Sequence, residues 1–276
     1  MPILSVLAVV FSVVFIIVVI AYAITRPDTK TKTAAYVHAK AGIQNHAAGD
    51  LAGAEREFAE ALDISPTLIT AHLGRADLFY AQKRYDEALA DLDQVIALDP
   101  SARALFLRGE TYAAQQRFDE AIRDFDQAFS FPLDRNWVGI VNTQLGWAKL
   151  SKAFTLSAAE GRAAAEDALI DLDEAVYLDP RNPSALLFRG QAYLLTQQNQ
   201  AALSDFERAA ELKPDHKLAL AGQAVAQYAL GHLDETKALW GKLLELDADY
   251  ANPDKLRDEY RCADSFLEIA RKVAAL

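Results

Sequence analysis

The chain has 276 residues, of which 52% are hydrophobic and 24% are charged, and its formal net charge at pH 7 is −11. This composition excludes wholesale disorder, and the acidic surplus excludes the concentrated basic surface that phosphate binding needs, so we expect no nucleic-acid partner. A single cysteine, Cys262, excludes an internal disulfide and a multi-cysteine metal site.

The first predicted element is a transmembrane anchor helix over residues 1–25. The stretch from Ile3 to Ile24 carries no charge, and as one helix it would be ~33 Å long, enough to cross the hydrocarbon core of a bilayer. The alternative is a cleaved leader of an exported, periplasmic protein, because Ala21 and Ala23 have the small side chains of a cleavage site. The length of the apolar run favours the anchor.

A linker over residues 26–34 follows the anchor and sets the expected orientation. Arg26, Lys30 and Lys32 come after the apolar run, whereas no basic side chain precedes it. The positive-inside rule therefore predicts a single-pass membrane protein with its N-terminus outside and the rest of the chain in the cytoplasm.

A repeat of about 34 residues governs the remaining sequence. In each repeat an alanine opens a helix, a large apolar residue follows four positions later, a mostly small residue follows that, and a proline ends the unit. The alanines are Ala54, Ala88, Ala121, Ala168 and Ala202, the large residues are Phe58, Leu92, Phe125, Leu172 and Phe206, the small residues are Ala61, Val95, Ala128, Ala175 and Ala209, and the prolines are Pro66, Pro100, Pro132, Pro180 and Pro214. A small residue twelve positions before the alanine belongs to the preceding helix, as at Gly42, Ala76, Gly109 and Gly190.

This pattern resembles the tetratricopeptide repeat, a helix–turn–helix unit that buries its apolar face only by stacking on its neighbours. The resemblance implies an all-α, right-handed solenoid of about six units over residues 35–250, closed by a capping helix within residues 251–276. The expected units are residues 35–68, 69–101, 102–136, 137–182, 183–216 and 217–250.

The fourth unit departs from the repeat length. About ten extra residues separate its two helices, between Gly146 and Ala168. Because the insertion is rich in alanine, we expect both helices to lengthen around a turn near Glu160 and Gly161.

The C-terminal end of the repeat is also atypical. Thr236 stands at the alanine position of the sixth unit and Trp240 at the large position. After it, Asn252 and Pro253 predict the start of one final helix that runs to about Ala275. Its apolar stripe would cover the last repeat, and the alternative is that this helix lies in the groove of the solenoid. The stripe consists of Leu256, Tyr260, Phe266, Ile269 and Val273.

Three Asp-x-Asp triplets resemble a metal or sugar-nucleotide site, but their register argues against one. Side chains two residues apart on a helix point about 200° apart, so the paired carboxylates cannot hold one ion. We therefore predict that they are solvated flanks of the repeated helix. The pairs are Asp91 with Asp93, Asp124 with Asp126, and Asp171 with Asp173.

No other motif indicates chemistry. The histidines form no His-x-x-x-His pair, and no phosphate-binding glycine loop or nucleophile elbow occurs. We expect no catalytic residue, no metal and no cofactor, and we expect the histidines to be surface or groove residues. They are His38, His46, His72, His216 and His232.

The resemblance places a concave peptide-binding groove along the first helices of the units. A groove this apolar suits an amphipathic helix or an extended apolar peptide. Trp147 is the expected anchor, and the alternative is that some of these residues pack between repeats or under the C-terminal helix. The groove residues are Tyr36, Leu73, Asp77, Tyr80, Phe106, Glu110, Ile140, Trp147, Leu150, Leu187, Gln191, Leu194, Val225 and Tyr228.

These features together predict a non-catalytic, membrane-tethered scaffold or adaptor. Its partners would be polypeptide segments of membrane or membrane-associated proteins, and its role would be the assembly or stabilisation of a membrane protein complex. A permanent structural subunit of such a complex is the alternative.

Overall fold

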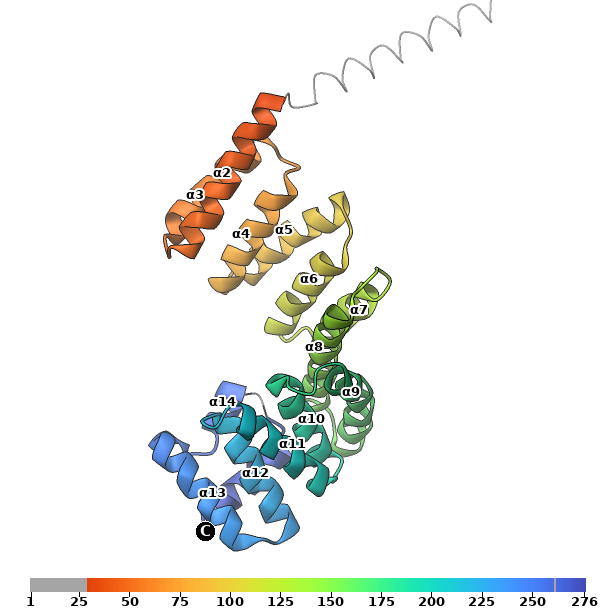
Figure 1. The fold of residues 1–276 in the computed structure, drawn as a ribbon, viewed down its shortest axis with the longest axis vertical. Helices are drawn as coiled ribbons and strands as arrows, with labels where there is room; N and C mark the ends of the chain where they lie inside the picture. Colours follow the sequence, from red (N-terminus) through yellow and green to blue (C-terminus); the bar gives the residue numbers. More distant parts are fainter. Residues whose placement is uncertain (1–28, 261) are drawn as a thin grey trace, which may run out of the picture. The chain divides into compact units, whose positions relative to one another are not determined.

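A computed structural model describes residues 29–260 and 262–276, and every regular element in these ranges is a helix (Figure 1). The all-α prediction is therefore confirmed for this part of the chain. No helix of the described ranges is both long and apolar enough to cross a membrane. The predicted anchor over residues 1–25 lies outside the described residues.

The described chain divides into two compact units between Pro100 and Ser101. In the first unit two helix pairs stack on each other, because α3 packs against both α2 and α4. Its helices are α2 (Thr29–Ala47), α3 (Leu51–Ile64), α4 (Ile69–Ala81) and α5 (Tyr85–Leu98).

The second unit continues the same alternation of paired helices and ends in a different C-terminal arrangement. Each helix of a pair packs on its partner, and each pair packs on the next through α7 with α8, α9 with α10, and α11 with α12. The paired helices are α6 (Ala102–Ala114), α7 (Phe118–Ala128), α8 (Arg135–Ala153), α9 (Ala158–Leu178), α10 (Pro183–Leu195), α11 (Asn199–Leu212), α12 (Lys217–Leu230) and α13 (Leu233–Leu246).

The predicted large residue of each repeat is the centre of its core. Phe58 on α3 is fully buried, and a Cβ atom added at Gly42 or at Gly74 would lie only 2.8 or 2.5 Å from its ring. Phe206 on α11 is packed in the same way between Gly190 and Gly222. Two glycines, one from the same pair and one from the next, therefore let two helices approach one phenylalanine.

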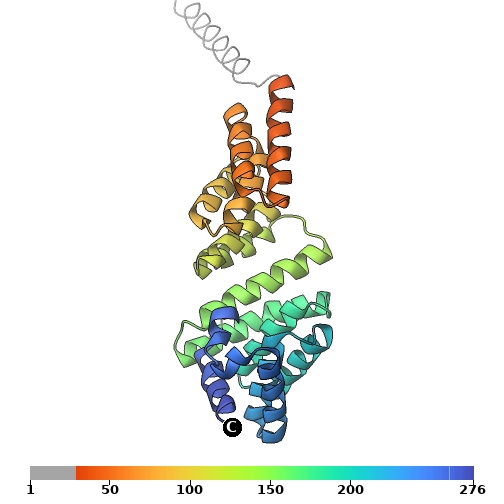
Figure 2. The ribbon, with the colours of Figure 1, turned by 90° about the vertical axis from the view of Figure 1, so that its left-hand side faces the viewer.

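The insertion in the fourth unit lengthens both helices, as predicted, but the turn lies earlier than predicted. The turn occupies residues 154–157, between α8 and α9, which appear in green in Figure 2. Glu160 and Gly161 belong to the first turn of α9. Gly161 is needed there for close approach, because a Cβ atom would lie 2.8 Å from the carbonyl oxygen of Ala153.

The single final helix predicted from Pro253 to about Ala275 is wrong. The chain instead forms a short 3-10 helix η1 (Ala248–Ala251), then α14 (Lys255–Tyr260) and α15 (Asp264–Ala274). One continuous helix would be ~34 Å long and would hold Leu256 far from Val273. The break lets both residues enter one buried cluster.

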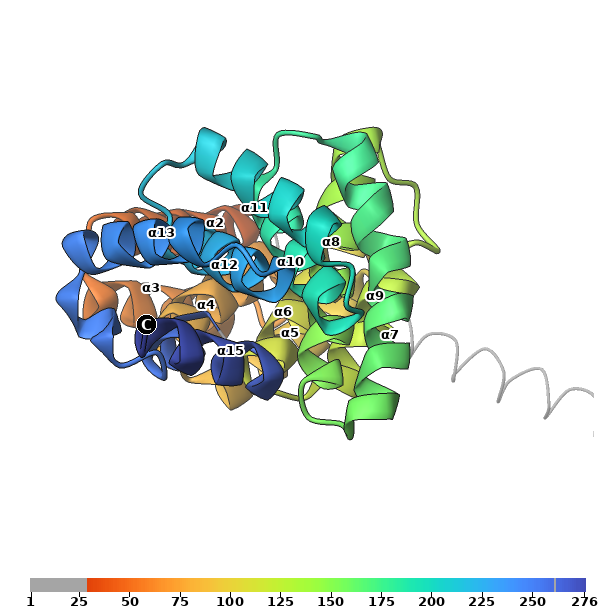
Figure 3. The same cartoon turned by 90° about the horizontal axis from the view of Figure 1, so that it is seen from below.

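Helix α15 packs against α12, α13 and α10, and Figure 3 shows it alongside α12. Phe266, Leu267, Ala270 and Val273 form its buried stripe. Because α10 and α12 are the first helices of their pairs, α15 borders the inner face of the last two repeats. Leu256, Phe266 and Val273 of the predicted stripe lie in one buried cluster with residues of the last repeats, although on two helices and not on one.

The first aspartate of each triplet is not a solvated flank. Asp91 and Asp124 are buried, and each accepts two hydrogen bonds, of 2.7–2.8 Å, from an arginine of the partner helix, Arg75 or Arg108. Each of these aspartates lies three residues after the buried alanine and so shares the buried side of its helix. Asp93, Asp126 and Asp173 are exposed, as predicted.

The same ion pair recurs in the later repeats. Arg189 contacts Asp205 at 2.7 Å, although that unit has no triplet, and Lys149 contacts Asp171 at 2.8 Å. The carboxylates therefore join the two helices of one repeat.

His72 is a buried residue and not the surface or groove histidine that the sequence predicted. Its Nδ1 atom lies 2.7 Å from Oδ1 of Asp91, and its Nε2 atom lies 2.9 Å from the carbonyl oxygen of Pro66. Both neighbours are acceptors, so the ring can donate from both nitrogens only when it is protonated. The hydrogen bond to Asp91 raises the pKa of His72.

Candidate functional site

In the first unit, the predicted groove residues Tyr36 and Tyr80 are 55% and 40% exposed. Tyr80 meets Tyr85 edge to face, with the ring centroids 5.7 Å apart. Asp77 is also exposed and lies 3.5 Å from Nδ1 of His46, whereas Leu73 is half-buried. This face therefore offers exposed aromatic surface.

In the second unit, several predicted groove residues are buried. Phe106, Leu150, Leu187 and Val225 are each at most 7% exposed. Phe106, for example, meets Trp137 edge to face at 5.5 Å. Each of these four side chains therefore exposes little surface to a partner. Val225 nevertheless lines the pocket described below.

Trp147, the predicted anchor, is half-buried and lies between two aromatic rings, one from the preceding repeat and one from the following repeat. Its centroid is 6.3 Å from Phe118 and 6.1 Å from Phe188. The ring therefore links three helix pairs. Whether Trp147 also contacts a partner stays a prediction, as do the roles of the half-buried residues Ile140 and Tyr228.

Glu110 on α6 is a half-buried carboxylate that accepts a hydrogen bond from a neutral group. The side-chain amide of Gln144 donates to its Oε1 atom at 3.1 Å. Burial raises the pKa of Glu110 to about 7, and the hydrogen bond from Gln144 lowers it only in part. This carboxyl group therefore titrates near neutral pH.

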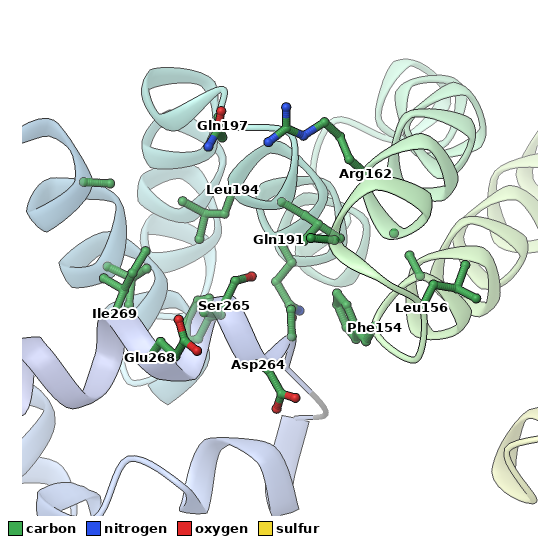
Figure 4. Close-up of a pocket in the computed structure, with 18 of the residues that line it drawn as sticks. Phe154, Leu156, Arg162, Gln191, Leu194, Gln197, Asp264, Ser265, Glu268 and Ile269 are labelled. Carbon is green, nitrogen blue, oxygen red and sulfur yellow. The ribbon is translucent and has the colours of Figure 1, made fainter.

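The second unit also holds a pocket of about 580 Å³ on the inner face of its last repeats. Three predicted groove residues line it. They are Gln191 and Leu194 on α10, which Figure 4 labels, and Val225 on α12. The volume falls within the range of about 300–1,000 Å³ that ligand pockets occupy. The repeat register thus located the floor of this pocket.

The walls of the pocket come from the two elements in which the chain departs from the repeat. The turn between α8 and α9 contributes Phe154 and Leu156, and α15 contributes Phe266 and Ile269. The sequence signalled both elements, through the insertion and the C-terminal apolar stripe. It gave no indication that they face each other, because that depends on the break before α15.

The rim of the pocket is charged. Arg162 from α9 and Glu268 from α15 are both exposed, and Figure 4 shows them on different sides of Gln191. Asp264, at the start of α15, lines the pocket and pairs with Arg257. Sequence reasoning missed all three rim residues, because they lie outside the repeat positions that line a groove.

The pocket offers apolar area and hydrogen-bonding groups. Within residues 29–260 and 262–276, no three histidine, cysteine, aspartate or glutamate side chains lie close enough together to hold a metal ion. The arrangement suits the binding of an organic group with apolar and polar parts.

Comparison with known proteins supports the predicted repeat over part of the chain. The sequence profile described as the tetratricopeptide repeat matches residues 73–134 and 156–216. A search of curated protein sequences finds no match.

Among solved structures, the fold is similar to several proteins of low sequence identity. Pseudomonas aeruginosa PilF has a TM-score of 0.66 at 18% identity, covering 84% of this chain and 100% of PilF. The type IV pilus biogenesis factor PilW has a TM-score of 0.62 at 19% identity, covering 85% of this chain and 97% of PilW. YrrB, described as having an unusual peptide-binding site, has a TM-score of 0.55 at 19% identity, covering 78% of this chain and 97% of YrrB.

Proposed function

We propose that this chain, in which residues 73–134 and 156–216 match the tetratricopeptide repeat, is a non-catalytic scaffold that binds polypeptide segments of other proteins on its inner face. The observation that carries the proposal is the pocket of about 580 Å³, whose floor consists of inner-face residues of α10 and α12. The lining combines apolar side chains with polar ones, and polar groups in a pocket fix the orientation of a bound ligand.

One comparison, with YrrB, supports a polypeptide as the ligand. YrrB shares the fold and is described as a peptide-binding protein, and PilF and PilW share the fold, with PilW described as a pilus biogenesis factor. Fold alone does not fix function, so the weight rests on the pocket of this chain. The proposal assigns to the chain a role in the assembly or stabilisation of a protein complex.

The proposal includes a membrane tether over Ile3–Ile24, with the repeats in the cytoplasm. The motivation is the uncharged run of these residues and the basic residues that follow it. A tether raises the effective concentration of the binding face for partners at the same membrane, without any new contact. The partners would then be membrane or membrane-associated proteins.

Affinity purification of the full chain from native membranes in mild detergent tests this function. We expect membrane proteins to co-purify in sub-stoichiometric amounts and to dissociate reversibly. Stoichiometric recovery that resists salt and detergent would show a permanent structural subunit instead. Recovery of nothing above background would refute binding altogether.

Two variants and one sequencing experiment make the test specific. Leu194→Asp places a charge in the pocket, whereas Ile170→Asp changes an apolar residue of α9 that is 68% exposed and outside the pocket. We expect loss of the partners with the first variant only, provided that both variants keep their helical circular dichroism. N-terminal sequencing of the mature chain tests the tether, because a chain that begins at Met1 or Pro2 would exclude a cleaved leader.

A further inference from the structure

Gln191 occupies an unusual position in the floor of the pocket. The residue is only 4% exposed, and its Oε1 atom is buried without a hydrogen-bond partner in the described part of the chain. A buried amide oxygen that lacks a donor costs about 1–3 kcal/mol relative to a satisfied one. The residue lines the pocket, so a rotation of its side-chain amide would let a ligand there supply the missing bond.

The chemistry of a primary amide restricts the ligand. The Gln191 side chain carries one acceptor and two donor hydrogens, and rotation of its last torsion exchanges the oxygen and the nitrogen. A main-chain peptide group presents an N–H and a C=O that match both parts of the amide. A ligand that carries only acceptors, such as a phosphate, would leave Oε1 unsatisfied.

The apolar lining indicates what accompanies that peptide group. Phe154, Leu194 and Ile269 approach the pocket from three different elements, namely the α8–α9 turn, α10 and α15. An apolar side chain next to the bound peptide group would bury its surface against all three, at about 25 cal/mol per Å².

The charged residues at the rim of the pocket favour one orientation of the bound segment. Arg162 and Glu268 lie on different sides of Gln191, and neither forms an ion pair with another described residue. Opposite charges at the two sides favour a segment with an acidic residue near Arg162 and a basic residue near Glu268. Exposed charges of this kind select partners more than they strengthen binding.

We infer that the pocket binds the main chain of an extended polypeptide segment of a partner protein, paired with the Gln191 amide. One apolar residue of the segment lies among Phe154, Leu194 and Ile269, with an acidic residue on one side and a basic residue on the other. This inference rests on the proposed function. It specifies which part of the inner face binds the partner and which residues of the partner segment are recognised.

The test uses the full chain in detergent micelles and a random twelve-residue peptide library displayed on phage as the probe. We expect enrichment of peptides in which an apolar residue lies between an acidic and a basic residue. The Kd of an enriched synthetic peptide, measured by fluorescence anisotropy, should rise about tenfold in Gln191→Leu. The control Ile170→Gln should leave it unchanged.

A charge exchange provides a second variant that does not disturb the buried residues. The double variant Arg162→Glu/Glu268→Arg should weaken the enriched peptide several-fold. A second peptide has the acidic and basic residues exchanged. The Kd of the double variant for this peptide should equal the Kd of the unchanged protein for the original peptide.

Two results would overturn the inference. In the first, the enriched peptides bind Gln191→Leu and the double variant as tightly as they bind the unchanged protein. The peptides would then bind elsewhere on the inner face, and the scaffold function would stand. A library that yields no enriched peptide would exclude an extended segment as the occupant. The scaffold function itself would fail only if partners from native membranes were also lost.

Discussion

Asp124 on α7 accepts two hydrogen bonds from Arg108 on α6, each 2.7 Å long, and so joins the two helices of one repeat. The carboxylate side chain is 6% exposed. Removal of one partner from a buried ion pair leaves the other charge uncompensated. The pair therefore stabilises the packing of α6 on α7, and its loss should lower the free energy of unfolding.

Asp124→Asn should destabilise the second unit by about 3 kcal/mol, the lower end of the range for a broken buried pair. Asp126→Asn, two residues away on the exposed side, should change the stability by less than about 0.5 kcal/mol. Urea denaturation followed by circular dichroism measures both. Equal effects of the two variants would contradict the assignment of Asp124 to the buried side.

His72 should make the stability of the first unit depend on pH. Its pKa is raised in the folded state, chiefly by the hydrogen bond to Asp91. A raised pKa contributes stability that is complete below the unfolded value of about 6.5 and is lost as the pH rises through the folded pKa. The stability advantage of the unchanged protein over His72→Gln should therefore be larger at pH 5.5 than at pH 8.5.

The readout for His72 is direct. Its imidazole resonances in a nitrogen–proton correlation spectrum should titrate above pH 6.5. A His72 that titrates at or below the value of an exposed histidine would show that the ring is not held as a double donor.

Gly74→Ala should destabilise the first unit, because the added Cβ atom would lie 2.5 Å from the ring of Phe58. Overpacking of this kind costs about 1–3 kcal/mol. Gly241→Ala is the matched control, since it lies in α13 with no atom within 4 Å of the new Cβ. There the better helix propensity of alanine should stabilise the protein by up to about 1 kcal/mol. Thermal unfolding should show opposite signs for the two variants.

The difference in stability between Glu110→Gln and the unchanged protein should depend on pH. Because burial raises its pKa to about 7, the folded state favours the protonated carboxyl, and stability is lost as the pH rises from about 4.5 through 7. Glu110→Gln should therefore be more stable than the unchanged protein at pH 8, by about 1 kcal/mol after allowance for solvent screening. At pH 4.5 the two proteins should be nearly equal.

The repeat core was predictable from the sequence because its physics is periodic. Ala54, Phe58 and Ala61 follow the period of one helix, and the same three positions recur at a fixed distance in the next repeat. The buried ion pairs carry a comparable signal that the prediction missed. Arginine precedes its aspartate by sixteen residues at Arg75, Arg108 and Arg189.

The less regular elements were harder to predict, because they depend on contacts between distant residues. The positions of the turn after Ala153 and of the break before Asp264 depend on the apolar side chains that each helix buries against distant helices. Local helix propensity carries no information on these contacts. Gln191 and Leu194 were placed on the groove face by register alone. Arg162, Phe154 and Glu268 join them only through the folded positions of the insertion and α15.

Site-specific photocrosslinking in native membranes tests the central claim most directly. A photoreactive amino acid at Leu194, in the pocket, should crosslink to partner polypeptides, and the same group at Ile170, on the exposed side of α9, should not. Mass spectrometry of the adduct from position 194 should identify a segment with an apolar residue between opposite charges. Adducts formed equally at both positions, or only at position 170, would contradict binding on the inner face.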